Sequence, residues 1–572
     1  MNTMSKGATR AIMAGVLAGS VMLGVAWAPG VAPHRAALAP ASGIVTLTNA
    51  QPPDGCGLAS NVASDIDVCT PMQDQLFTTD DHLTIRPDLV AYIPTTGNGG
   101  AGIVHGNLVV TYRLKPNLRW SDGVPLTADD VIFSVRVNLA VGNTFGLDQI
   151  ATMTKLDDRT VRFTYRGVYA PYLAYGWPSP LLPRHHLQKK YGTTDVKKIA
   201  NSVLTDYYND PNDVWSGPYK LQSWSDGQTI VLVPNPYYSA RSPAPGHPRL
   251  QQIKYVTVST SGPNLSVDLH APRIGIDMAD GFEFDDLPRL THTAYHITAQ
   301  PALAVEHLEL NQAGALRDVR LRQALQYAID KRALFKELFP SVSNADDFLL
   351  RTVLPNASPW TDTSLRVSAY NPARARALLR AAGYADRYGG PGRHLTLNFV
   401  TFAGSSIRQT TFGILQKDWA RVGIDVHLTI ANGDTRVKSS MFGSYDQNGV
   451  LARRHFDIAF FYYVGSPDPQ QAEPSVDPGA IPTRAQPGGQ NYAGIADWDQ
   501  FDLLLRARHE VIPGRRQALL NRWQRLVNER VYFIMLYARP NITVDDGKIG
   551  NFKPNPSQAG NTWNAFEWYY KG

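Results

Sequence analysis

The stretch LTLNFVTFAGSSIRQTTFGILQKDWARVGIDVHLTI, residues 395–430, decides the fold of the C-terminal half. Leu395, Leu397 and Phe399 alternate as in a strand, and residues 406–422 have the apolar spacing of a helix. Residues 424–430 then alternate again. A strand, a helix and a strand of these lengths predict a right-handed crossover between two parallel strands. The run at residues 457–461 predicts a further buried strand, so this half is expected to be an α/β lobe.

The rest of the chain carries weaker local patterns of the same kinds. We expect strands over residues 44–49, 108–114, 161–165 and 229–233. Thr127 can cap a helix, because Asp129 and Asp130 suit the positive end of the helix dipole. Asn371 with Pro372 starts another helix, which Gly383 should end. A further helix is expected to start at Pro513.

Length and composition point to a soluble protein of more than one domain. The 572 residues are too many for one hydrophobic core, and 43% hydrophobic with 18% charged residues is typical of a globular chain. The net charge is +6, but Lys and Arg are scattered, so we expect no nucleic-acid partner.

The N-terminus has the pattern of an export segment. Lys6 and Arg10 precede an uncharged apolar run that ends at Ala28, which predicts a signal peptide or an uncleaved N-terminal anchor over residues 1–28. Residues 29–43 are rich in Pro and Ala and are expected to be a tether. The protein is therefore expected outside the cytoplasm, in the periplasm or on the outer face of the membrane.

The two cysteines fit that location. Cys56 and Cys69 are the only cysteines, and a lone close pair in an exported protein is usually a disulfide. Two unpaired thiols are the alternative. A metal site is not expected, because two thiols do not complete a tetrahedral shell.

Motifs of enzymes are missing from the sequence. It contains no GxxxxGK[ST] loop, no GxSxG and no HExxH, and we expect neither catalysis nor a cofactor. A hydrolase with a pair of carboxylates in a cleft remains an alternative, because such a pair leaves no sequence motif. The 26 Tyr and 11 Trp could wall a binding cleft.

Five motifs in order resemble one family. They are LKPNLRWSDGVPLTADDVIFS (114–134), SGPYKLQSWSDGQTIVLVPNPYY (216–238), LELNQAGALRDVRLRQALQYAIDKRAL (308–334), YNPARARALLRAAGY (370–384) with GID (423–425), and a tail from GQNY (489–492) to Leu536 and Tyr537. Over residues 44–572 they resemble the bacterial extracellular solute-binding proteins of family 5, which serve peptide, dipeptide and nickel ABC importers.

The resemblance implies a two-lobed, periplasmic-binding-protein-like α/β fold of the large class. The first lobe would hold residues 44–300 and 538–572, with an extra subdomain over residues 91–214. The second lobe would hold residues 301–537. The two lobes would close like a hinged trap over a peptide or a peptide-like polar solute, as a monomer that delivers it to ABC permease subunits with a separate ATPase. A ligand sensor and a binder of nickel chelates or oligosaccharides remain alternatives on the same fold.

The resemblance also suggests a ligand site. In peptide-binding relatives an aspartate after a buried strand pairs with the α-ammonium of the peptide, and the aromatic residues before it wall the pocket. That aspartate aligns with Ser466 here, Asp468 follows two residues later, and Tyr462 and Tyr463 would contact the ligand. Trp224 and Trp360 are weaker candidates. We therefore expect either a ligand other than an ordinary free-amine peptide, or Asp468 as a substitute anchor; a plain turn at these residues is the alternative.

Overall fold

The protein is described by a computed structural model. It describes residues 43–49, 53–58, 63–142, 146–173, 181–206, 208–225, 229–241, 248–257, 275–280, 282, 290, 294–386, 392–466, 468–557 and 559–571. The predicted export segment and nearly all of the predicted tether lie outside these residues.

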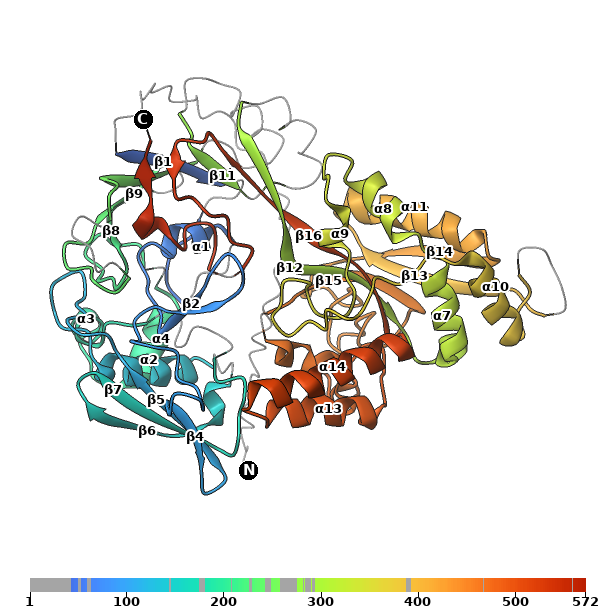
Figure 1. Ribbon diagram of the computed structural model, residues 1–572, viewed down its shortest axis with the longest axis horizontal. Coiled ribbons are helices and arrows are strands. Elements are labelled where there is room, and N and C mark those ends of the chain that lie inside the picture. Colours follow the sequence, from blue (N-terminus) through green and yellow to red (C-terminus); the bar gives the residue numbers. More distant parts are fainter. Residues whose placement is uncertain are drawn as a thin grey trace, which may run out of the picture.

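One ten-stranded sheet runs through both lobes (Figure 1). Its order is β14 (Ile424–Ala431), β13 (Leu395–Phe402), β15 (Ile458–Val464), β12 (His296–Leu310), β16 (Phe533–Asp545), β11 (Met278–Asp280), β1 (Ile44–Asn49), β10 (Gln252–Val256), β9 (Thr229–Pro234) and β8 (Tyr219–Ser225). The long strands β12 and β16 carry the chain from one lobe to the other. The predicted two-lobed α/β fold is therefore confirmed.

The second lobe contains the predicted crossover. Strands β13 and β14 are parallel, and α11 (Ser406–Ala420) connects them. Strand β15 pairs with β13, also in parallel. The other helices of this lobe are α7 (Val319–Tyr327), α8 (Lys331–Leu338), α9 (Ala345–Phe348), α10 (Pro372–Ala381), α12 (Glu473–Val476), α13 (Trp498–Arg508) and α14 (Pro513–Arg530).

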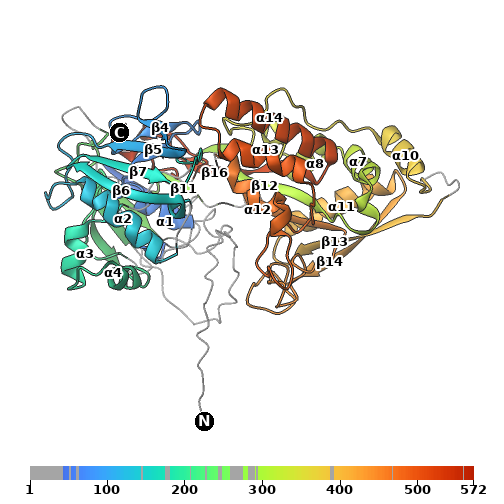
Figure 2. The same ribbon diagram turned by 90° about the horizontal axis from the view of Figure 1, so that it is seen from below.

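The first lobe carries a second, four-stranded sheet. Its order is β4 (Ala101–Val104), β5 (Asn107–Arg113), β7 (Thr160–Tyr165) and β6 (Ile150–Asp157), and α2 (Ala128–Ala140) packs beside it. The smaller elements of this lobe are α1 (Ala63–Cys69), β2 (Phe77–Thr79), β3 (Ile85–Pro87), α3 (Arg184–Lys190), α4 (Val196–Val203), β17 (Ile549–Gly550) and β18 (Tyr569–Tyr570). Seen from below in Figure 2, this four-stranded sheet faces the ends of α13 and α14.

The predicted helix ends are confirmed where they can be compared. The N–H of Thr127 donates to the carboxylate of Asp130 at 2.9 Å, which starts α2. The side chain of Asn371 accepts from the N–H of Arg374 at 2.9 Å, which starts α10. Gly383 follows that helix with a φ of +83°, a conformation that glycine adopts without strain.

Paired prolines mark the crossing between the lobes. Pro301 of β12 lies opposite Pro540 of β16, and the register of the pairing shifts between Pro301 and Val305. Neither proline has an N–H to donate, so the ladder is weakened in both strands at one level. This is the place where we expect the lobes to bend relative to each other.

The core of the first lobe combines both ends of the chain. Val45 and Leu47 from β1 pack in the same cluster as Ile549, Ala565 and Trp568. The hydroxyl of Tyr219 also donates to the backbone carbonyl of Ala565 at 3.5 Å. The last residues therefore complete the core that the first strand begins.

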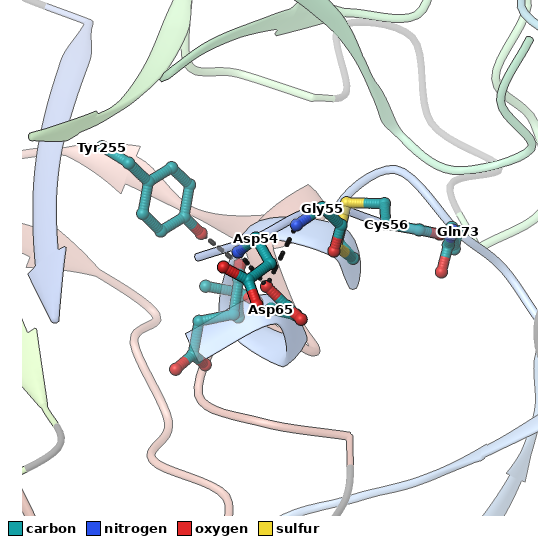
Figure 3. The surroundings of a disulfide bond; sticks show 9 residues. Asp54, Gly55, Cys56, Asp65, Gln73 and Tyr255 are labelled. Atoms are coloured by element: carbon teal, nitrogen blue, oxygen red, sulfur yellow. Dashed lines mark hydrogen bonds between the residues drawn. A yellow bond between two sulfur atoms is a disulfide. The ribbon is translucent and has the colours of Figure 1, made fainter. Parts of the chain in front are cut away.

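A disulfide joins Cys56 and Cys69, the pair that the sequence predicts (Figure 3). The loop before it is held by further contacts: Asp65 accepts from the N–H of Asp54 at 2.7 Å, and Gln73 donates to the carbonyl of Cys56 at 2.7 Å. The disulfide thus fixes the start of the first lobe to the end of α1.

Two pairs of carboxyl groups flank β11 and join distant parts of the first lobe. Asp277 accepts from the N–H of Thr46 at 2.7 Å, and burial, together with Asp546, raises its pKa to about 7. At the other end of β11, Asp280 accepts from the side chain of Asn561 at 2.9 Å and lies beside Asp67. Burial, and then Asp280, raises the pKa of Asp67.

These pairs predict a first lobe that loses stability as the pH rises. An unfolded aspartate releases its proton near pH 4, whereas folded Asp277 retains it to about pH 7. Between these values the folded state binds more protons, so the free energy of unfolding should fall from pH 4 to pH 7 and then level off. Urea unfolding at several pH values across this range measures the effect. The free energy of unfolding should fall less steeply with pH in Asp277→Asn than in the wild type.

The matched control is Asp446→Asn, because Asp446 is exposed on the second lobe. It should leave the slope unchanged. A slope that is equal in the wild type and in Asp277→Asn would contradict the raised pKa of Asp277.

Candidate ligand site

The candidate site lies where β15 leaves the core next to the lobe crossing. Strand β15 pairs antiparallel with β12, so that Tyr462 lies opposite Glu306 and Tyr463 opposite Val305. The strand is fully buried up to Phe461 and half-buried from Tyr462. Because successive side chains of a strand point to opposite faces, the two tyrosines have different neighbours.

Two guanidinium groups lie near the ring of Tyr462. Those of Arg408 and Arg539 lie 5.3 and 5.0 Å from the centre of its ring, within the range of cation–π attraction. Arg408 also donates to Glu306 at 2.9 Å, and both of these side chains are buried. The ring of Tyr462 is therefore held in place by charged groups beside the crossing.

Tyr463 is held by a different set of contacts. Its ring stacks on His307 with centroids 4.6 Å apart and planes 17° apart. Its hydroxyl donates to Glu309 at 3.3 Å, and Glu309 also accepts from the N–H of Ala493 at 2.7 Å. Burial, and then the charge of Glu309, raises the pKa of Tyr463 well above its ordinary value, so the hydroxyl is a hydrogen-bond donor at neutral pH.

Ser466 and Asp468 form a turn after β15. The hydroxyl of Ser466 donates to the carbonyl of Asp468 at 2.7 Å and accepts from its N–H at 3.1 Å. The carboxylate of Asp468 accepts two hydrogen bonds from Arg516, at 2.7 and 2.9 Å, and one from the N–H of Gln470 at 2.9 Å. Asp468 is 7% exposed and Arg516 4% exposed, so this is a buried, bidentate ion pair.

The two candidate tryptophans lie in different cores. Trp360 packs in the same cluster as Tyr463 and stacks against Arg516, whose guanidinium is 4.6 Å from the ring centre. Trp224 packs in the core of the first lobe. The structure thus places Trp360 beside Arg516, the partner of Asp468, and Trp224 in a different core from Tyr463.

Several residues at this site were not predicted from the sequence: Glu306, His307, Glu309, Arg408 and Arg516. The run LAVEHLEL, residues 303–310, did contain a usable pattern, because it places three ionisable residues inside an otherwise apolar strand. Buried ionisable groups need partners, so such a strand should lie next to a polar site.

Within the described ranges, no set of three or more His, Cys, Asp or Glu side chains is arranged to hold a metal ion. Within the same ranges, no helix combines the length and the apolar character that crossing a membrane requires.

Two α/β lobes on one sheet, joined by two strands and with aromatic side chains beside the crossing, define a two-lobed solute-binding protein. The chain belongs to the bacterial extracellular solute-binding proteins, family 5: residues 102–476 match the middle region of that family.

Individual proteins with known names share 30% or less of their residues with this chain over the regions compared below. The chain is 30% identical over 264 residues to the probable D,D-dipeptide-binding periplasmic protein DdpA of Escherichia coli, which covers 43% of this chain and 47% of that protein, about half of its length. It is 25% identical over 465 residues to the oligopeptide-binding protein OppA of Mycobacterium bovis, covering 78% and 71% of the two chains. The solved structure of the periplasmic EDTA-binding protein EppA shares the fold, with a TM-score of 0.71, 22% identity, and 93% and 97% of the two chains covered.

Proposed function

We propose that the protein captures a peptide or a peptide-like polar solute outside the cytoplasm and delivers it to the permease subunits of an ABC importer. The family match over residues 102–476 is the observation that carries this proposal. Relatives named for binding oligopeptides and D,D-dipeptides support this choice of solute. The paired prolines at the crossing fit capture by hinge closure, with the lobe boundaries near residues 300 and 538. No chemical step is required.

We propose further that the solute is held without a carboxylate for an α-ammonium group. Ser466 stands at the aligned anchor position and has no charge. Asp468 already accepts three hydrogen bonds and is neutralised by Arg516, so it is a poor substitute anchor. The geometry therefore favours a ligand that is not an ordinary free-amine peptide, with Tyr462 as part of the wall; Tyr463 points to the opposite face, where it contacts His307 and Glu309.

Calorimetry with di- to pentapeptides, each with a free and an acetylated N-terminus, tests this proposal. A charge-assisted hydrogen bond contributes about 1.5–3 kcal/mol, which is roughly a tenfold to hundredfold difference in affinity. We expect acetylation to change the affinity of the wild type by less than that. Mass spectrometry of solute released from the purified protein would identify the natural ligand.

The substitution Ser466→Asp should make the protein prefer peptides with a free N-terminal amine. In Ser466→Asp the new carboxylate can still accept from the N–H two residues later, as the serine hydroxyl does now. This variant should prefer free-amine over acetylated peptides by roughly tenfold or more. Ser466→Asn is the control with the same shape and no charge. A wild type that already loses binding on acetylation would show that this account of the ligand is wrong.

A further inference from the structure

The two lobes touch at a second place besides the crossing strands. The N–H of Ala170, in the first lobe, donates to the carbonyl of Arg508 at the end of α13 at 2.8 Å. Val511, in the loop between α13 and α14, packs against the core of the four-stranded sheet. Ala170 is 7% exposed, so water is largely excluded from the hydrogen bond. We refer to Ala170, Arg508 and Val511 as the interlobe contact.

The interlobe contact depends on the relative position of the lobes. It lies well away from the central strands β12 and β16, at the ends of α13 and α14 (Figure 1). A rotation about the prolines at 301 and 540 therefore moves Arg508 relative to Ala170 by more than it moves residues at the crossing. Since a hydrogen bond weakens steeply beyond its normal length, such a rotation breaks this contact, and we call the arrangement in which it is formed the closed one.

Arg516 connects the interlobe contact to the segment that follows β15. Its Nε donates to the carbonyl of Ala507 at 3.1 Å, while its terminal nitrogens hold Asp468. Arg508 in turn donates to Glu473 at 2.7 Å. Asp468 and Glu473 thus bind the two arginines that fix the end of α13. Both carboxylates lie in the segment that directly follows β15.

We propose that Arg516 is a positioning residue that links the candidate ligand segment to lobe closure: through Asp468 and Ala507 it presents the Arg508 carbonyl to the N–H of Ala170. This inference rests on the proposed function, since closure matters only if a solute is captured. It gives Asp468 a role other than anchoring the ligand. A displacement of the segment after β15 changes the fraction of molecules whose lobes are closed. That fraction in turn affects the affinity for solute.

Hydrogen exchange of the full chain, with no solute added, tests the proposal. Val511→Ala removes packing in the interlobe contact, and Ala170→Pro removes its donor. Arg516→Lys keeps the charge beside Asp468 but loses the fork that reaches Ala507. Backbone amides of residues 168–173 should exchange about threefold to tenfold faster in Val511→Ala and in Arg516→Lys, as expected for the loss of one modest interaction. Ala170→Pro should increase the radius of gyration in small-angle X-ray scattering.

Val437→Ala is the matched control, because Val437 is 40% exposed on the same lobe. It should leave the exchange of residues 168–173 unchanged. If Arg516 were only structural, its substitution would loosen residues 466–473 and α14 but not a segment of the other lobe. Unchanged exchange of residues 168–173 in either Val511→Ala or Arg516→Lys would overturn the proposal. Because the measurement needs no solute, its failure is distinguishable from a failure to bind peptides.

Discussion

Arg516→Ala should lower the free energy of unfolding by about 3–5 kcal/mol, because it leaves the buried carboxylate of Asp468 without its partner. The loss exceeds the strength of the ion pair itself, since an unpaired buried charge retains the full cost of its lost hydration. Two further contacts of the guanidinium disappear as well: the bond to Ala507 and the stacking on Trp360. Urea unfolding at neutral pH measures the loss.

Two companion variants separate this effect from a general weakening of α14. Arg522→Ala removes an exposed arginine from the same helix and should change stability by less than about 0.5 kcal/mol. The double variant Asp468→Leu with Arg516→Met removes both charges and should be more stable than Arg516→Ala alone. A double variant that is less stable than the single one would argue against a stranded carboxylate.

Loss of the disulfide is the second large effect that we expect. Cys56 and Cys69 are 13 residues apart in sequence, and closing a loop of this length stabilises the folded state by about 3 kcal/mol in the chain-entropy description. The double variant Cys56→Ala with Cys69→Ala should therefore unfold at a lower urea concentration. Its free energy of unfolding should be lower than that of the wild type by about 3 kcal/mol. Alanine avoids the cost of burying new hydroxyl groups at these two buried positions.

Reduction of the wild-type protein provides an independent measurement of the same bond. Reducing agent should lower the stability of the wild type and leave the double alanine variant unaffected. Free thiols titrated in the unreduced, unfolded wild-type protein would contradict the pairing.

Periodic elements were predictable because their patterns are local. The strand at residues 395–402, the helix at 406–420 and the parallel pairing of the flanking strands follow from apolar spacing over one continuous stretch. The capping of α10 by Asn371 likewise depends on neighbours within three residues. Proline is ambiguous even locally: Pro183 could mark a loop, but in the structure it directly precedes the first turn of α3, where proline is tolerated.

The candidate site was less predictable because its contacts are long-range. The apolar run at residues 457–461 predicts the strand that leads into Tyr462 and Tyr463, but their partners Arg408 and Glu309 lie 54 or more residues away in sequence. The role of Asp468 depends on Arg516, 48 residues further along the chain. Sequence alone therefore indicated that an aspartate follows the strand, but not that a buried arginine already neutralises it.

The packing of the last residues into the core of the first lobe has a consequence for the order of synthesis. Trp568 and Ala565 share a core with Val45 and Leu47, and the N–H of Asn561 donates to Asp67 at 2.8 Å. A ribosome makes residues 44–300 of this lobe first, then the 237 residues 301–537, and only then the tail that completes the lobe. The core of the first lobe thus stays incomplete until residues 561–568 are made, whereas all strands described for the second lobe are made by residue 545. We expect the second lobe, which is inserted in the sequence of the first, to fold first, and the first lobe to fold last.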